Sequence, residues 1–93
     1  WRLRILLKKM LVLNKKDNVG VLLEDGKAGD SCSYNGDNIK LTDDIVFGHK
    51  VALKDFEKED LVIKYGEEIG YALGNIKKGQ WVHNRNMGCR RGK

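Results

Sequence analysis

The chain has 93 residues, of which 41% are hydrophobic, and a formal net charge of +5 at pH 7. This length predicts one small domain, and the hydrophobic share argues against disorder over most of it. The charge is unevenly placed: residues 1–9 hold four Lys and Arg, residues 88–93 hold three, and residues 10–87 hold eleven against thirteen Asp and Glu. A nucleic-acid reader usually places its basic stripe on the folded face, so no nucleic-acid partner is expected.

Cysteine usage and hydropathy indicate the compartment. Cys32 and Cys89 are far apart and belong to no metal-binding pattern, which is typical of a reducing cytoplasm rather than of a disulfide framework. The apolar run at residues 3–13 is interrupted by basic residues and is too short to span a membrane. We therefore expect a cytoplasmic protein with no membrane partner.

Residues 1–9 are predicted to be a basic N-terminal extension. They read as a short basic amphipathic helix without an N-cap, and they precede Met10, which resembles a natural start. The domain is expected to span residues 10–87, and residues 88–93 to form a basic tail or linker. Chain ends of this kind are usually poorly ordered unless tied down, so both are expected to be dispensable for folding.

Short β-type runs follow one another through the domain. They lie at residues 10–13, 18–23, 31–34, 39–42, 51–53, 61–63, 69–72 and 81–82. The dipeptide Asn35-Gly36, between the third and fourth runs, favours a type I′ hairpin. No apolar period of 3.6 extends over three helical turns, so the chain is predicted to be all-β.

A repeated turn phrase joins many of these runs. It begins at Asp44, Asp55 and Asn75, with a weaker copy at Asp25, and has Gly or Glu four residues after the Asp or Asn. The Asx side chain can bond its own backbone two residues on, and a glycine at the later position suits positive φ. The spacings between copies are 19, 11 and 20 residues, so no solenoid of fixed period is expected.

Two histidines are the candidate chemical groups. His49 and Lys50 follow a turn glycine and could bind a carboxylate substrate or shuttle a proton. If the strand continues over residues 81–86, His83 and Arg85 point the same way and form a second polar face for an anion. An exposed loop histidine beside an ordinary surface lysine explains the same residues, and sequence chemistry alone favours that interpretation. Two isolated histidines are far from a zinc motif.

Several of these motifs, taken in order, resemble the amino-terminal domain of the altronate and galactarate dehydratases. They lie at residues 48–53, 62–66, 69–70 and 79–83 and at Asn86, and the resemblance covers residues 10–87. It implies an SAF-type domain with a compact β-clip fold, as in antifreeze-like domains. The family often has His-x-His-Asn after the Trp-Val pair, whereas this chain has Arg85 in place of the second histidine. The replacement argues against metal ligation from that position and leaves anion binding intact.

The resemblance implies a share in a lyase acting on sugar acids. In this family a larger catalytic part removes water from a hydroxy acid such as altronate or galactarate with a divalent metal, usually iron; related two-subunit enzymes include a sulfolactate sulfo-lyase. This chain is then a small subunit, inactive alone, that completes the substrate site of a large catalytic subunit. His49 and His83 are the expected catalytic residues, Lys50, Arg85 and Asn86 the expected substrate contacts, and no metal ligand is expected in this chain. The alternative is a non-catalytic SAF-type binding or assembly module.

Overall fold

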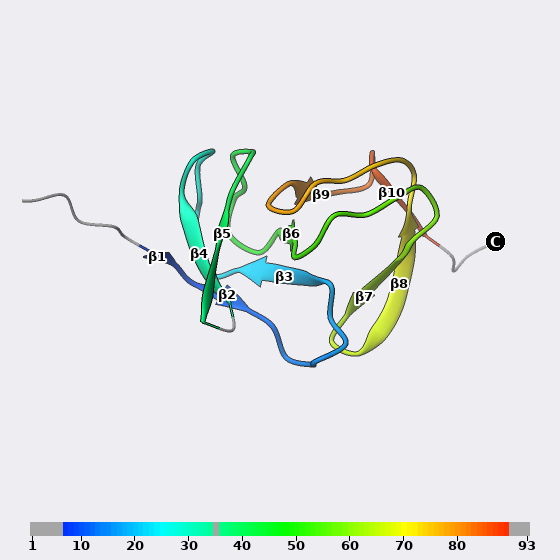
Figure 1. The fold of residues 1–93 in the computed structure, drawn as a ribbon, viewed down its shortest axis with the longest axis horizontal. Coiled ribbons are helices and arrows are strands. Elements are labelled where there is room, and N and C mark those ends of the chain that lie inside the picture. Colours follow the sequence, from blue (N-terminus) through cyan, green and yellow to red (C-terminus); the bar gives the residue numbers. More distant parts are fainter. Residues whose placement is uncertain (1–6, 35, 90–93) are drawn as a thin grey trace, which may run out of the picture.

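The computed structural model describes residues 7–34 and 36–89 (Figure 1). Its strands are β1 (Leu7–Lys8), β2 (Met10–Leu11), β3 (Val19–Leu22), β4 (Ser31–Tyr34), β5 (Asp37–Lys40), β6 (Lys50–Ala52), β7 (Leu61–Lys64), β8 (Glu67–Ala72), β9 (Trp81–Val82) and β10 (Met87–Gly88). No helix occurs in these residues, which confirms the all-β prediction. The same part of the chain accordingly has no helix long and apolar enough to cross a membrane.

The strands form three small sheets. The middle sheet has the order β2-β3-β6-β9, and the other two have the orders β1-β4-β5 and β10-β8-β7. All pairings are antiparallel except that of β1 with β4. Figure 1 shows the β4–β5 and β7–β8 hairpins on the two sides of the middle sheet. The middle sheet therefore joins two hairpin units that are distant along the chain.

All four turn phrases make an equivalent backbone hydrogen bond, from the amide of a positive-φ residue to a carbonyl of another segment. In each of them the fourth residue after the Asx position has positive φ: Gly29 (96°), Gly48 (88°), Glu59 (77°) and Gly79 (90°). Their amides donate to the carbonyls of Leu41, Leu22, Ala72 and Ala52, respectively, at 2.7 to 2.9 Å. The prediction of positive φ at Gly48 and Gly79 is thus confirmed. Antiparallel bridges from Gly26 to Ile45 and from Phe56 to Ile76 join the turns in two pairs.

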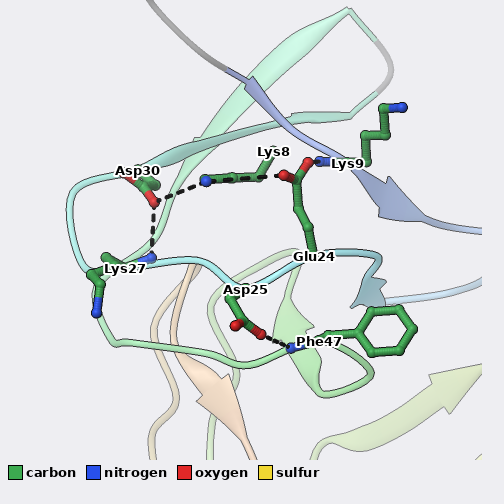
Figure 2. A network of polar contacts seen from close by, with 7 residues as sticks. All are labelled: Lys8, Lys9, Glu24, Asp25, Lys27, Asp30 and Phe47. Atoms are coloured by element: carbon green, nitrogen blue, oxygen red, sulfur yellow. Dashed lines mark hydrogen bonds and ion pairs between the residues drawn. The ribbon is translucent and has the colours of Figure 1, made fainter.

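The side chains of Asp25, Asp44 and Asp55 bond to the opposite turn of their pair, and the prediction of local Asx-turns is wrong for these three residues. Asp25 Oδ1 accepts from the Phe47 amide at 2.8 Å, as Figure 2 shows, and Asp44 Oδ1 accepts from the Ala28 amide at 2.9 Å. Asp55 Oδ1 binds the Lys78 amide in the same way at 2.8 Å. Because each turn is bridged to its partner, the partner's amides lie within reach of these carboxylates.

The paired turns reveal a duplication that the uneven spacings conceal. Asp25 and Asp55 are 30 residues apart, and Asp44 and Asn75 are 31 apart, so a turn–hairpin–turn unit occurs twice. Each unit has its own buried cluster. The first consists of Leu22, Cys32, Ile39, Leu41, Ile45, Val51 and Leu53. The second consists of Val19, Ala52, Phe56, Val62, Ala72, Ile76 and Val82.

Residues 7–9 are extended, and the helix prediction is wrong for them. Leu7 and Lys8 form β1, which pairs with β4. The Lys9 amide donates to Glu24 Oε2 at 2.8 Å, and Lys8 Nζ lies 3.9 Å from Asp30 and 4.0 Å from Glu24 (Figure 2). Strand pairing prevails here because the open edge of β4 supplies backbone partners that an isolated short helix lacks.

The other end also joins a sheet, because Met87 and Gly88 form β10 against β8. Trimming the chain to residues 10–87 would therefore remove β1 and part of β10. The expectations for residues 1–6 and 90–93, and for Asn35 in the hairpin turn, lie outside the described residues.

Candidate functional site

A shallow hollow of about 380 Å³ lies where the second turn meets β9. It is lined by Gly48, His49, Lys50, Trp81, Val82, His83 and Asn84. The antiparallel register of β6 and β9 creates it, because Lys50 is paired with Val82 and Val51 with Trp81. Two histidines that are isolated in the sequence thereby line one hollow.

Trp81 contacts both histidine rings, and we call these three residues the His–Trp–His cluster. The Trp81 ring centroid lies 5.4 Å from that of His49 and 4.1 Å from that of His83, distances at which aromatic rings attract each other. The backbone of Trp81 is fixed, since its amide donates to Asp43 Oδ2 at 3.0 Å and its carbonyl accepts from Asn86 Nδ2 at 2.8 Å. Trp81 therefore has a fixed backbone and packs against both imidazoles.

His49 departs from the rule that the other three turns follow. The residue after each positive-φ position is Asp30, His49, Asp60 or Gln80. Three of these side chains accept a hydrogen bond from a turn amide: Asp30 from Lys27 at 2.9 Å, Asp60 from Glu57 at 2.8 Å and Gln80 from Lys77 at 2.9 Å. The ring of His49 instead lies against Trp81. Natural proteins tend to break local rules of this kind at functional sites, so the exception indicates that His49 is a candidate functional residue.

The chain turns immediately after β9, so the prediction of an extended segment over residues 81–86 is wrong. Asn86 Oδ1 accepts from the His83 amide at 2.8 Å, and the Asn86 amide donates to the His83 carbonyl at 3.1 Å. This turn places Asn84 in the wall of the hollow and leaves Arg85 exposed. Asn86 is half-buried and bridges the backbones of Trp81 and His83.

The turn also selects a tautomer of His83. The Arg85 amide donates to His83 Nδ1 at 3.2 Å. A ring nitrogen that accepts a hydrogen bond has no proton, so the neutral ring has its proton on Nε2. His83 is therefore a hydrogen-bond donor through Nε2.

Lys50 is a half-buried cation without an acidic partner. Burial lowers the pKa of its ammonium group, and the charge of Lys64 lowers that pKa further. Among the described residues, the ion pairs involve Lys8 and Lys54 but not Lys50. A desolvated and unpaired ammonium group is stabilised by an anionic ligand, and a carboxylate meets this requirement.

The donor set of the hollow does not fit a metal by itself. In the described part of the chain, no three His, Cys, Asp or Glu side chains gather where they could hold an ion. The hollow offers two imidazoles, whereas a catalytic metal typically has three protein ligands. One of these imidazoles, that of His83, already accepts a hydrogen bond from the Arg85 amide at Nδ1.

Fold and hollow together define a small all-β module in which two imidazoles and an ammonium group line one hollow. A family model described as the altronate/galactarate dehydratase SAF domain matches residues 8–90, and the chain belongs to this family. The family predicted from the sequence motifs is thus confirmed.

The relatives are dehydratases and a lyase subunit. The chain is 36% identical over 80 residues to altronate dehydratase of Bacillus subtilis (strain 168), a match that covers 86% of this chain and 16% of that enzyme. It is 46% identical over 70 residues to altronate dehydratase of Escherichia coli (strain K12), covering 75% of this chain and 14% of the enzyme. It is 48% identical over 48 residues to (2R)-sulfolactate sulfo-lyase subunit alpha of Paracoccus pantotrophus, covering 52% of this chain and 72% of that subunit. The chain thus spans only a small part of the altronate dehydratases and much of the lyase subunit.

Sequence reasoning placed His49, Lys50 and His83 among the site residues but missed Trp81 and Asn84. A signal for Trp81 is present in the repeat. Trp81 follows Asn75 by six residues, as Lys50 follows Asp44, so the two residues are equivalent in their turn phrases. No comparable signal marks Asn84, because its place depends on the turn that Asn86 stabilises.

Proposed function

We propose that this chain is the small SAF-domain subunit of a sugar-acid hydro-lyase and that it completes the substrate site of a separate large catalytic subunit. The supporting observation is the His–Trp–His cluster beside the unpaired Lys50, in a chain of the dehydratase SAF family. The alpha-subunit relative supports a separate small chain, since the match covers 72% of that subunit.

The groups in the hollow suit a hydroxy-acid substrate. Dehydration removes a proton from the carbon beside a carboxylate and eliminates a hydroxyl group from the next carbon. We assign the carboxylate to the Lys50 ammonium group, with His83 Nε2–H and the Asn84 amide as further donors. The ring of His49 packs on Trp81 instead of bonding to its own turn, and it would act as the acid or base at the substrate.

The remaining residues have supporting roles in this proposal. Asn86 would position Trp81 and His83 through its two backbone bonds, and Arg85 would meet the substrate or the large subunit from the exposed turn. A divalent metal, expected in the large subunit, would supply Lewis acidity at a substrate oxygen. The cytoplasm is the proposed compartment, since the free thiols of Cys32 and Cys89 suit reducing conditions.

The test is co-expression with the large dehydratase chain encoded in the same genome. The purified complex is assayed with ferrous iron on altronate, galactarate and (2R)-sulfolactate, whose products distinguish dehydration from desulfonation. We expect turnover by the complex and none by this chain alone. His49→Ala should lower kcat by about 10²- to 10⁴-fold, the usual contribution of general acid–base catalysis. His83→Ala, which removes a hydrogen-bond donor to the substrate, should lower turnover by about 10²- to 10³-fold. In both cases the complex should stay intact on gel filtration.

Lys77→Ala is the matched control, because Lys77 is an exposed cation on the fourth turn, away from the lining of the hollow. Its turnover should equal that of the wild type. If no complex forms, or if both histidine variants keep full turnover, the chain is instead a non-catalytic SAF-type binding or assembly module.

A further inference from the structure

The tip of the second turn differs in chemistry from the tips of the other three. Two exposed residues precede each positive-φ position: Lys27-Ala28, Val46-Phe47, Glu57-Lys58 and Lys77-Lys78. Three tips thus have at least one charged side chain, as is usual for solvated turns. Val46 and Phe47, which we call the apolar tip, are 52% and 63% exposed. The duplicated fold therefore exposes a large apolar pair at one of four equivalent positions.

The apolar tip is held firmly. The Phe47 amide donates to Asp25 Oδ1 at 2.8 Å, and Figure 2 shows the phenyl ring directed away from this bond. The next amide, of Gly48, donates to the Leu22 carbonyl at 2.8 Å, and the His49 amide donates to the Val46 carbonyl at 3.2 Å. An aromatic side chain on a fixed backbone loses little conformational entropy on binding, which makes it a suitable interface anchor.

The apolar tip adjoins the hollow. Phe47 is followed directly by Gly48 and His49, which line it. A partner that closes over the hollow to complete a substrate site must approach this rim. In the altronate dehydratases the matched segment is only 14% to 16% of the enzyme, so most of such an enzyme lies outside the SAF segment.

We propose that the apolar tip docks into an apolar pocket of the large catalytic subunit and so aligns the His49 hollow with that subunit's active site. This proposal rests on the proposed function. The side chains of Asp25 and Asp44 are exposed next to the tip, so the pocket is expected to have a basic rim.

The experiment measures the Kd of the full chain for the large dehydratase chain of the same genome. Phe47→Lys copies the lysine at the equivalent position of the fourth turn, Lys78, and should raise Kd about tenfold or more, as for an interface anchor. Turnover of this variant should recover at saturating concentration, because the hollow is unchanged. Leu73→Lys is the control, since Leu73 is an exposed apolar residue elsewhere, at 43%, and its Kd should equal that of the wild type.

The outcomes separate this inference from the proposed function. If the wild type binds and is active but Phe47→Lys binds equally well, the docking surface is elsewhere and the proposed function stands. If the wild type does not bind the large chain, both proposals fail. If Phe47→Lys and Leu73→Lys raise Kd equally, with unchanged melting curves, this result would also contradict a specific anchor at Phe47. If sedimentation shows that the wild type self-associates and Phe47→Lys does not, the occupant is a second copy of this chain and the proposal is overturned.

Discussion

Replacing Gly79 by alanine is expected to destabilise the domain far more than replacing Gly48 by alanine. The two glycines occupy equivalent positions, with φ of 90° and 88°. Their amides donate to the carbonyls of Ala52 and Leu22, respectively, so the backbone bonds are also matched. What differs is the space around each residue.

The conformational contribution is nearly the same at both sites. An alanine in the left-handed region costs about 1–2 kcal/mol, and the smaller entropy of the unfolded chain offsets about 0.4–1 kcal/mol of this. At Gly48, an added Cβ has no heavy atom within 4 Å, so the net loss should be about 1 kcal/mol.

At Gly79 a packing cost is added. A Cβ there would collide with the carbonyl oxygen of Lys40, at the end of β5. The neighbouring Thr42 amide donates to the Gly79 carbonyl at 3.0 Å, so the two backbones are held together and cannot separate cheaply. Overpacking typically costs about 1–3 kcal/mol, which brings the expected loss for Gly79→Ala to about 2–4 kcal/mol.

The assay is urea unfolding followed by far-UV circular dichroism, with the slope m checked for constancy. The Gly79 variant should unfold at a clearly lower urea concentration than the Gly48 variant. Equal losses of unfolding free energy, or a larger loss at Gly48, would refute the close contact between β5 and the fourth turn.

Two further predictions concern titratable groups. Burial lowers the pKa of Lys50 below its ordinary value of 10.5, so the unfolded chain holds the Lys50 proton more tightly than the folded chain does. This lysine therefore destabilises the fold at any pH where it is charged in both the folded and the unfolded chain. Lys50→Met should therefore raise the unfolding free energy at pH 7 by a few tenths of a kcal/mol, a gain that shrinks as the pH rises toward 10.5; a gain that grows with pH would contradict the reasoning. Burial, together with the nearby Asp30 and Glu24, raises the pKa of the Cys32 thiol, whereas Cys89 is exposed. A thiol reagent should modify Cys89 in the native protein and Cys32 only on unfolding, and two fast reactions would show that Cys32 is accessible.

The sequence by itself determined the features that depend on neighbouring residues. The short β-type runs, separated by turn residues, and the absence of a helical period established an all-β chain. Turn chemistry identified the positive φ of Gly48 and Gly79, because the backbone conformation of a tight turn depends on its own few residues. The ordered motifs established the family, which the match over residues 8–90 confirms.

Tertiary structure alone decided which segments meet. The carboxylates of Asp25 and Asp44 bind amides of the opposite turn, since the two turns of a pair are bridged 19 residues apart. The register of β6 and β9 brings His49 to Trp81, and the turn after Val82 puts Asn84 in the hollow instead of Arg85. Such contacts join residues far apart in the chain, so their geometry follows from strand pairing and packing, which local patterns do not encode.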